Sequence, residues 1–332
     1  MSDKPRARRA NAADVAVAVR EASTQLAALV ERTPTVPSPW WSKATGAEVR
    51  LKLENVQVTG SFKLRGASNA LCRLPADRLR RGVVAASSGN HGLGLAAAAS
   101  RLQVSATVFV PKTTPDAKRH AIAAYGAEVL VHGDDCVVTE QHARDVAEAS
   151  GRHYVSPYNN SHVIAGQGTV AVELLEQWPD VEVVYVALGG GGLIAGMAAY
   201  AKSVHPDIEF VACSPTASPA MAECVRQGRI VDVPCSDTLS DSTAGGVEPG
   251  AITFPLCQQL VDRFVEVDED AIRRALVQTL EHQHLLVEGA AAVAFAACAA
   301  DAELRGRRAA IVVCGGNIPL ATLRRVLAAD AS

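Results

Sequence analysis

A run of four glycines stands among the residues most able to do chemistry. It follows the apolar stretch Val183–Leu188 and precedes the helical pattern Leu193–Val204. Glycine lets the backbone approach a ligand closely, and a helix start offers free N–H groups at the positive end of the helix dipole. The run therefore predicts an anion site, most simply for a phosphate group. A glycine-rich turn without a ligand is the alternative.

Each class of phosphate ligand requires particular residues after such a glycine run. A nucleotide-triphosphate loop needs lysine and then serine or threonine after its last glycine, and Leu193 and Ile194 stand there instead. A dinucleotide site expects an acidic residue at the end of the next strand, where this chain has Ser214. These neighbours favour a compact phosphate cofactor and leave a nicotinamide oxidoreductase as a weaker rival.

Lys63 is the candidate nucleophile. It lies between Phe62 and Leu64 in a segment that also holds Gly60, Ser61 and Gly66. Apolar neighbours favour the neutral form of an amine, which can bond covalently to a carbonyl carbon. A surface lysine in a glycine- and serine-rich turn is the alternative interpretation.

The elements that must position these residues follow an alternating pattern. Short β-rich runs are expected at Val49–Leu53, Gly82–Ala86, Ser105–Val110, Glu128–Val131, Glu182–Leu188, Glu209–Cys213 and Ala309–Cys314. Helical runs are expected at Ala12–Glu31, Gly94–Leu102, Asp116–Tyr125, Thr139–Glu148, Gly168–Gln177, Leu193–Val204 and Glu269–His282. Strands that are almost wholly apolar indicate parallel strands covered on both faces. The pattern predicts an α/β fold with two lobes, each a mostly parallel twisted sheet flanked by helices, and a ligand cleft between them.

Four motifs carry a resemblance to a known family. Residues 59–67 read TGSFKLRGA and resemble the lysine motif of the threonine/serine dehydratase and serine racemase family of pyridoxal-phosphate enzymes, which have the tryptophan-synthase fold (fold type II). Further motifs occur in that family's order at Ser87–Gly92, at the glycine run with Leu193, and at Cys314–Asn317. The resemblance implies a large cofactor-binding domain of residues 1–81 and 159–332 and a small domain of residues 82–158. We expect no C-terminal regulatory domain.

The resemblance also implies roles for particular residues. Lys63 would be the Schiff-base lysine and general base, and Ser88 would handle a proton on the opposite face of the cofactor. The implied pyridoxal 5′-phosphate site comprises Phe62, Lys63, Asn90, Gly189, Gly190, Gly191, Gly192, Leu193, Glu288 and Cys314. The implied substrate site comprises Ser87, Ser88, Gly89, Asn90 and His91. Core packing or helix capping is the alternative for several of these residues, above all Phe62, Asn90, Cys314 and Glu288.

The implied reaction is the β-elimination of water and ammonia from a small β-hydroxy amino acid such as L-threonine or L-serine, which gives a 2-oxo acid. Two departures from the family pattern qualify it. Ser214 and Ala220 replace the acidic residues that bind a divalent cation in many relatives, so no metal site is expected. The segment Ser240–Gly246 is altered and resembles the branch linked to ectoine and hydroxyectoine utilisation or dehydratases of other hydroxy amino acids, such as 3-hydroxyaspartate. An amino-acid racemase and a non-catalytic binding relative are the remaining alternatives.

The composition of the chain limits the classes of partner that it could bind. The 332 residues carry a formal net charge of −3, with 48% hydrophobic and 20% charged residues, which is typical of a globular protein and gives no case for nucleic acid as a partner. We read the basic segment Lys4–Arg9 as a frayed terminus, not a binding arm, and find no signal peptide or membrane span. The eight scattered cysteines favour a reducing cytoplasm. The expected partner is a small amino-acid substrate, and the resemblance implies a homodimer.

Overall fold

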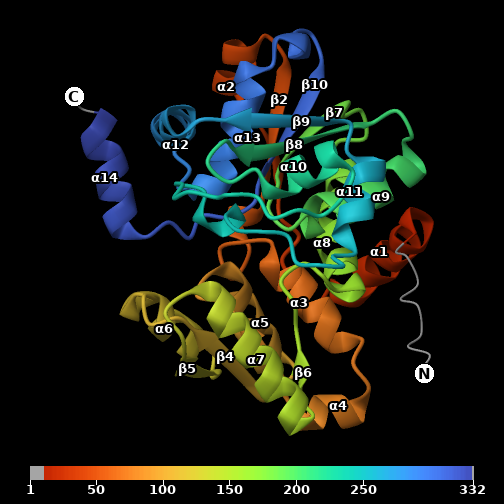
Figure 1. Cartoon of the computed structure of the whole chain (residues 1–332). Coiled ribbons are helices and arrows are strands. Elements are labelled where there is room, and N and C mark those ends of the chain that lie inside the picture. The colour runs from red at the N-terminus through yellow and green to blue at the C-terminus, as the bar shows by residue number, and fades with distance from the viewer. Residues whose placement is uncertain (1–10, 331–332) are drawn as a thin grey trace.

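The computed structural model describes residues 11–330, so the basic segment Lys4–Arg9 lies outside the described residues. Two sheets form two lobes (Figure 1). The six-stranded sheet of the large lobe has the order β1 (Thr35–Pro37), β2 (Glu48–Leu53), β10 (Arg308–Val313), β7 (Val183–Ala187), β8 (Glu209–Pro215) and β9 (Arg263–Val267). Only the pairing of β1 with β2 is antiparallel among the described strands of this sheet. The expected α/β class with mostly parallel sheets is confirmed.

The small lobe is built on a four-stranded, wholly parallel sheet. Its order is β5 (Glu128–Val131), β4 (Ala106–Val110), β3 (Val83–Ala86) and β6 (His153–Tyr154). The helices of this part of the chain are α4 (Ala76–Arg81), α5 (Asn90–Arg101), α6 (Asp116–Ala123) and α7 (Cys136–Ser150). Parallel strands need a crossover between them, and α5 and α7 supply it after β3 and β5.

The large lobe carries the remaining helices. They are α1 (Ala12–Leu26), α2 (Pro39–Thr45), α8 (Ser161–Gln177), α9 (Gly192–Val204), α10 (Ala220–Gln227), α11 (Thr253–Leu260), α12 (Glu269–Gln283), α13 (Gly289–Ala300) and α14 (Leu320–Asp330). Short 3-10 turns lie at Glu54–Val56, Asp241–Thr243 and Ala302–Leu304. Helix α13 is rich in alanine and is buried from Gly289 to Cys298, so it forms part of the core against β7, β8 and β10.

Helix α3 (Lys63–Cys72) lies where the two lobes meet. It packs closely on α5 and on α8, and glycines make this approach possible. A Cβ atom at Gly94 would lie 2.9 Å from the backbone carbonyl carbon of Lys63, and one at Gly166 would lie 2.6 Å from the carbonyl oxygen of Arg65. Leu64 and Leu71 join the hydrophobic cluster of the small-lobe sheet. The domain limits given above stay a prediction, because α3 contacts both lobes.

Several elements differ from their expected bounds. The proline-rich segment after Glu31, expected to be a break, contains β1, and Pro37 is tolerated there because β1 is an edge strand. Helix α1 ends at Leu26, earlier than expected. Helix α5 begins at Asn90, so its first turn includes residues we had expected to lie before it.

Candidate active site

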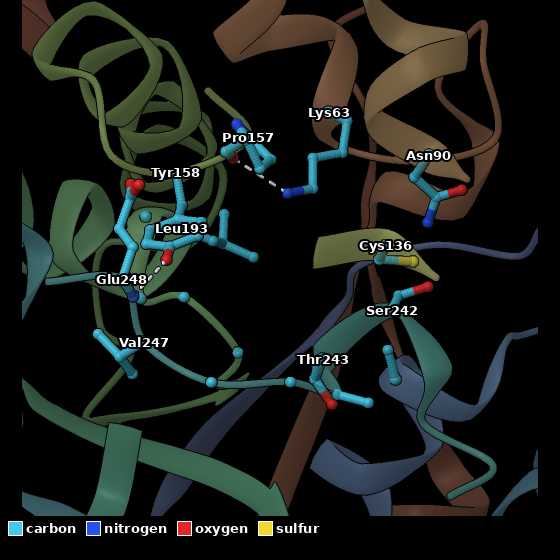
Figure 2. A pocket seen from close by; sticks show the side chains of 18 of the residues that line it. Lys63, Asn90, Cys136, Pro157, Tyr158, Leu193, Ser242, Thr243, Val247 and Glu248 are labelled. Carbon is cyan, nitrogen blue, oxygen red and sulfur yellow. Dashed lines mark hydrogen bonds between the residues drawn. The ribbon is translucent and has the colours of Figure 1, made fainter. Parts of the chain in front are cut away.

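A cavity of about 580 Å³ opens between the two lobes (Figure 2). All ten residues predicted to hold the cofactor line it: Phe62, Lys63, Asn90, Gly189, Gly190, Gly191, Gly192, Leu193, Glu288 and Cys314. They come from five separate segments of the chain, the four motifs already described and the segment that precedes α13. The fold therefore brings these segments together around one space.

Lys63 is the first residue of α3, and its side chain points into this cavity (Figure 2). Its Nζ donates a hydrogen bond to the carbonyl oxygen of Pro157 at 3.1 Å and lies 5.1 Å from the centre of the Phe62 ring. Burial lowers the pKa of the Lys63 amine to about 8, although Cys314 and Glu288 act in the opposite direction. A substantial fraction of the amine is thus neutral near physiological pH, as a nucleophile requires.

The backbone around Lys63 is held in place from the large lobe. Ser61 forms an isolated bridge with Gly315, and the N–H of Phe62 donates to the carbonyl oxygen of Cys314 at 3.1 Å. The lysine motif and the Cys314 motif, some 250 residues apart in the chain, are therefore one local structure. This pairing aligns Lys63 with the end of strand β10.

The glycine run forms the opposite wall. A Cβ atom at Gly190 would lie 2.3 Å from the Tyr158 ring, and one at Gly189 would lie 2.9 Å from the Cα atom of Thr243. Gly191 has a φ of +83°, a left-handed conformation that glycine adopts without strain. Helix α9 starts directly after it, and no side chain in the described chain caps that start. The N–H groups of the first turn are thus available to an anion in the cavity.

Asn90 and Glu288 meet at one side of the cavity. The Asn90 side-chain amide donates to both carboxylate oxygens of Glu288 at 2.8 and 3.0 Å, while its oxygen accepts from the Asn317 amide at 2.7 Å. The backbone N–H of Asn317 donates to Glu288 at 3.1 Å. Burial raises the pKa of the Glu288 carboxyl, which these donors partly offset.

Cys314 directly follows strand β10 and is buried at the cavity wall. Burial raises the pKa of its thiol well above the ordinary value, so the sulfur stays neutral at physiological pH. The family resemblance implies that Cys314 lies beside the cofactor's ring nitrogen as a neutral partner, and this role stays a prediction.

The predicted substrate residues other than Asn90 are not part of the cavity lining. The Ser87 hydroxyl accepts from the N–H of Gly89 at 3.2 Å, and Ser88 lies in the same turn before α5. His91 is buried, and its Nε2 lies 2.8 Å from the carbonyl oxygen of Val155. Burial lowers the pKa of the His91 imidazole to about 3, so the ring is neutral. The roles assigned to these residues stay predictions.

Sequence reasoning missed the residues that line the cavity on the side away from Lys63. They are Glu140, Gln141 and Arg144 from α7, Tyr158 after β6, and residues 247–249 of the large lobe, which follow the predicted segment Ser240–Gly246. Their sequence pattern gives no signal, because α7 reads as an ordinary polar helix and residues 244–252 belong to no helix or strand. Asn317 belongs to the motif Cys314–Asn317, but the sequence does not predict its contact with Asn90.

Neither of the two positions at which we expect no metal ligand carries a carboxylate. Ser214 lies in β8, with its hydroxyl 3.4 Å from the carbonyl oxygen of Leu188, and Ala220 begins α10. Within residues 11–330 no three histidine, cysteine, aspartate or glutamate side chains are grouped so as to hold a metal ion. The absence of a metal cofactor stays a prediction.

The residues that line the cavity are suited to bind pyridoxal phosphate. The glycine run lines the cavity at the uncapped start of α9, where free N–H groups suit a phosphate, and the Lys63 amine faces the same cavity. Asn90 offers an amide and Cys314 a neutral thiol at the walls. An acidic group for the ribose of a dinucleotide is missing at Ser214, which disfavours the nicotinamide alternative.

Comparison with known proteins agrees with this fit. Residues 26–315 match the family model described as pyridoxal-phosphate dependent enzyme, so the chain belongs to that family and is a pyridoxal-phosphate-dependent enzyme. It is similar to the L-threonine ammonia-lyase of Thermotoga maritima, with 40% identity over 309 residues that cover 93% of this chain and 77% of that protein. The catabolic L-threonine dehydratase of Escherichia coli is 37% identical over 309 residues, which cover 92% of this chain and 94% of that protein.

Solved structures of the same family superpose closely. Maize serine racemase has a TM-score of 0.89 and 32% identity, and the match covers 97% of this chain and 98% of that chain. The processed form of threonine deaminase isoform 2 from Solanum lycopersicum has a TM-score of 0.90 and 30% identity, covering 96% and 94%. The fold type predicted from the four motifs is therefore confirmed.

Two further observations bear on the setting of the enzyme. No helix in the described part of the chain has the length and apolar character needed to cross a membrane. All eight cysteines lie within the described residues and are free thiols.

Proposed function

We propose that this enzyme is an ammonia-lyase that removes water and ammonia from a small β-hydroxy amino acid such as L-threonine or L-serine and releases a 2-oxo acid. The observation that carries the proposal is the position of Lys63, whose amine faces a cavity that is also lined by the glycine run at the uncapped start of α9. The activities of the Thermotoga and E. coli relatives support the same reaction class.

Each of these residues of the cavity would have a distinct role in the reaction. The N–H groups at the start of α9 would hold the cofactor phosphate, Phe62 and Asn90 would orient its ring, and the neutral thiol of Cys314 would leave the ring nitrogen without a charged partner. When bound, the cofactor withdraws electrons from the α-carbon of the substrate and so acidifies the α-proton. Lys63 accepts that proton at Nζ, for which a pKa of about 8 is suited to a base near neutral pH.

The substrate carboxylate needs donors close to Lys63. The turn formed by residues 87–91, at the start of α5, offers backbone N–H groups and the Ser87 and Ser88 hydroxyls, and we assign it to that role. Its residues do not line the cavity apart from Asn90, so the role requires this turn to approach the substrate. Movement of the small lobe toward the large lobe would bring it there.

Racemisation of the same amino acids is the second candidate, because the maize structure of similar fold is a serine racemase. It would need a proton donor on the face opposite Lys63, for which Ser88 is the candidate. We rank elimination first, because the Thermotoga and E. coli relatives, at 40% and 37% identity, are an ammonia-lyase and a dehydratase. A specialised substrate is compatible with the altered segment 240–246, part of which lines the cavity. We also retain the proposals of a cytoplasmic location, which the free cysteines support, and of a homodimer.

The test is a substrate panel assayed for 2-oxo acid and ammonia release. It contains L-threonine, L-serine, the isomers of 3-hydroxyaspartate and hydroxyectoine-derived amino acids, with chiral analysis of the unreacted substrate. Stoichiometric 2-oxo acid and ammonia from any of these compounds support the lyase. Inversion of the α-carbon without ammonia release would instead establish the racemase, and no change in any compound would reject both.

A further inference from the structure

The charged residues at the mouth of the cavity, on the side away from Lys63, come from both lobes. Glu140 and Arg144 are one helical turn apart on α7 in the small lobe, and Glu248 lies in the large-lobe segment of residues 244–252. We call these three side chains the mouth triad. All three line the same cavity as Lys63 and the glycine run.

Arg144 is shared between the two carboxylates of the triad. Its terminal nitrogen donates to Glu140 and to Glu248, each at 2.7 Å, and its Nε donates to Glu140 at 3.1 Å. Its guanidinium also lies over the Tyr154 ring, 4.3 Å from the ring centre. One positive charge thus faces two negative charges, and the triad carries a formal net charge of −1.

Glu248 is fixed so that its charge stays at the cavity. Its backbone N–H donates to the Tyr158 hydroxyl at 3.0 Å, as Figure 2 shows, and one of its carboxylate oxygens accepts from Arg144. The other carboxylate oxygen, Oε1, is shielded from solvent and has no hydrogen-bond partner among the described residues. A carboxylate held in this way repels a second anion and can still accept a hydrogen bond.

The other charged groups that line the cavity do not offset the excess negative charge of the mouth triad. Lys63 is committed to the cofactor, whose phosphate adds further negative charge. Glu288 also lines the cavity, where it accepts a hydrogen bond from Asn90, and burial raises the pKa of its carboxyl. Near the mouth, Lys118 already pairs with Asp241 at 3.5 Å. A substrate side chain that carries a carboxylate would therefore enter the cavity with no uncommitted cation to receive it.

We infer that the mouth triad selects β-hydroxy amino acids with uncharged or positively charged side chains and excludes those with anionic side chains. This inference rests on the proposed function and deepens it, since it separates threonine and serine from 3-hydroxyaspartate. Glu248 is the main specificity residue and Glu140 reinforces it, because both carboxylates line the cavity that a substrate must enter to reach Lys63.

Elimination kinetics give the first test. In the wild-type holoenzyme we expect kcat/KM for L-threonine to exceed that for either L-isomer of 3-hydroxyaspartate by at least about 30-fold. Glu248→Gln and Glu140→Gln each remove one negative charge with almost no change in shape, and each should reduce this ratio by at least about fivefold. The matched control is Glu148→Gln, an exposed glutamate on the same helix α7 but outside the cavity, which should leave the ratio unchanged.

Binding of unreactive analogues gives a second test that does not depend on turnover. L-2-aminobutyrate has the size of threonine without the hydroxyl group, and L-aspartate has an anionic side chain; neither can lose water. Their dissociation constants, read from the visible spectrum of the holoenzyme, should favour L-2-aminobutyrate by at least about tenfold. This preference should shrink in both glutamine variants and at high salt, since the mouth is partly exposed.

The outcomes separate the two proposals. Equal binding and turnover of the anionic and neutral compounds by the wild-type enzyme would overturn the inference, and so would a preference that neither Glu248→Gln nor Glu140→Gln alters. Discrimination in binding with no 2-oxo acid from any β-hydroxy amino acid would instead leave the inference standing and reject the proposed function.

Discussion

The side-chain amide of Asn90 donates to both carboxylate oxygens of Glu288, across the boundary between the two lobes. Asn90 opens α5 in the small lobe, and Glu288 directly precedes α13 in the large lobe. Asn317 contacts both, through its side chain and its backbone N–H respectively. The wall of the active site is therefore one hydrogen-bonded unit drawn from three distant segments.

Replacing Glu288 by glutamine should weaken this unit. The new amide group would place N–H donors against the donors of Asn90 and Asn317, so we expect the holoenzyme to lose about 1–3 kcal/mol in its free energy of unfolding. Urea titration followed by circular dichroism measures it. The control is Glu281→Gln on the exposed side of α12. Equal midpoints for the two variants would show that the contact contributes nothing.

Lys63→Ala should abolish turnover while the fold survives, because α3 keeps its packing and only the amine is lost. We expect a fall in kcat of at least about 1,000-fold, together with loss of the visible band that borohydride would otherwise fix. Lys43→Ala, an exposed lysine on α2, is the control. A Lys63→Ala protein that retained wild-type rates would disprove the assignment of the nucleophile.

The pKa of Lys63 predicts how attachment of the cofactor depends on pH. The reactive form is the neutral amine, and burial lowers the pKa from 10.5 to about 8. The rate at which cofactor-free enzyme takes up pyridoxal phosphate should rise as the pH increases through about 8 and level off above it. Stopped-flow absorbance from pH 6.5 to 10 checks this. A rate that continued to rise toward pH 10 would mean that the amine is not desolvated.

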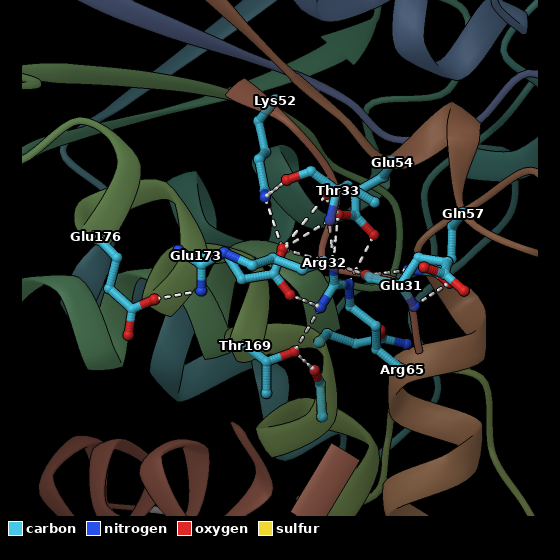
Figure 3. A network of polar contacts seen from close by, with 12 residues as sticks. Glu31, Arg32, Thr33, Lys52, Glu54, Gln57, Arg65, Thr169, Glu173 and Glu176 are labelled. Atoms are coloured by element: carbon cyan, nitrogen blue, oxygen red, sulfur yellow. Dashed lines mark hydrogen bonds and ion pairs between the residues drawn. The ribbon is translucent and has the colours of Figure 1, made fainter. Parts of the chain in front are cut away.

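Arg65 should prove essential for stability. Its guanidinium is fully buried and donates to Glu54 at 2.7 and 2.8 Å and to Glu173 at 2.6 and 2.9 Å (Figure 3). Lys52, also buried, donates to Glu173 at 2.7 Å, so two cations balance two anions. Arg65→Met would leave buried carboxylates unbalanced and should cost about 3–5 kcal/mol.

The control for Arg65 lies at the other end of the same helix. Arg73 pairs with Glu21 at the surface, and Arg73→Met should cost less than about 1 kcal/mol. Thermal and urea unfolding of both variants, with bound cofactor, gives the comparison. Similar losses in the two variants would mean that burial of the Arg65 network has no special energetic role.

Activity should not depend on a divalent cation. Ser214 and Ala220 offer no carboxylate, and no alternative cluster exists among the described residues. Dialysis against a chelator should therefore leave kcat/KM unchanged within about 20%, and added Mg²⁺ should not raise it. Stimulation by Mg²⁺ would reveal a site formed in another way.

The parts of the molecule that the sequence predicts well are those with strong local signals. The seven expected strands are all present, because long apolar runs bounded by turn residues identify buried parallel strands. The ten residues predicted to bind the cofactor all line one cavity, and all but Glu288 lie in motifs whose order identifies a family, while their individual roles stay predictions. The strands β1, β6 and β9 were not predicted. Strands β1 and β6 are very short, and β9 is an edge strand that contains polar residues.

What sequence could not predict depends on contacts between distant segments. Glu248, Tyr158 and Arg144 come together only because α7 and residues 244–252 face each other across the cavity. Each is an ordinary polar or aromatic residue in its local context. The start of α3 at Lys63 was also missed, because the preceding glycine and serine residues suggested a turn.

The position of β10 has a consequence for synthesis of the protein. This strand pairs with β2 on one side and β7 on the other, so residues 308–313 join an N-terminal hairpin to the rest of the large sheet. The small-lobe sheet uses only residues 83–154 and can form on the ribosome long before. A nascent chain that has not yet extended past Val313 thus carries a finished small lobe beside two unjoined halves of a sheet. The edges of β2 and β7 that face each other stay unpaired until residues 308–313 emerge and pair with both.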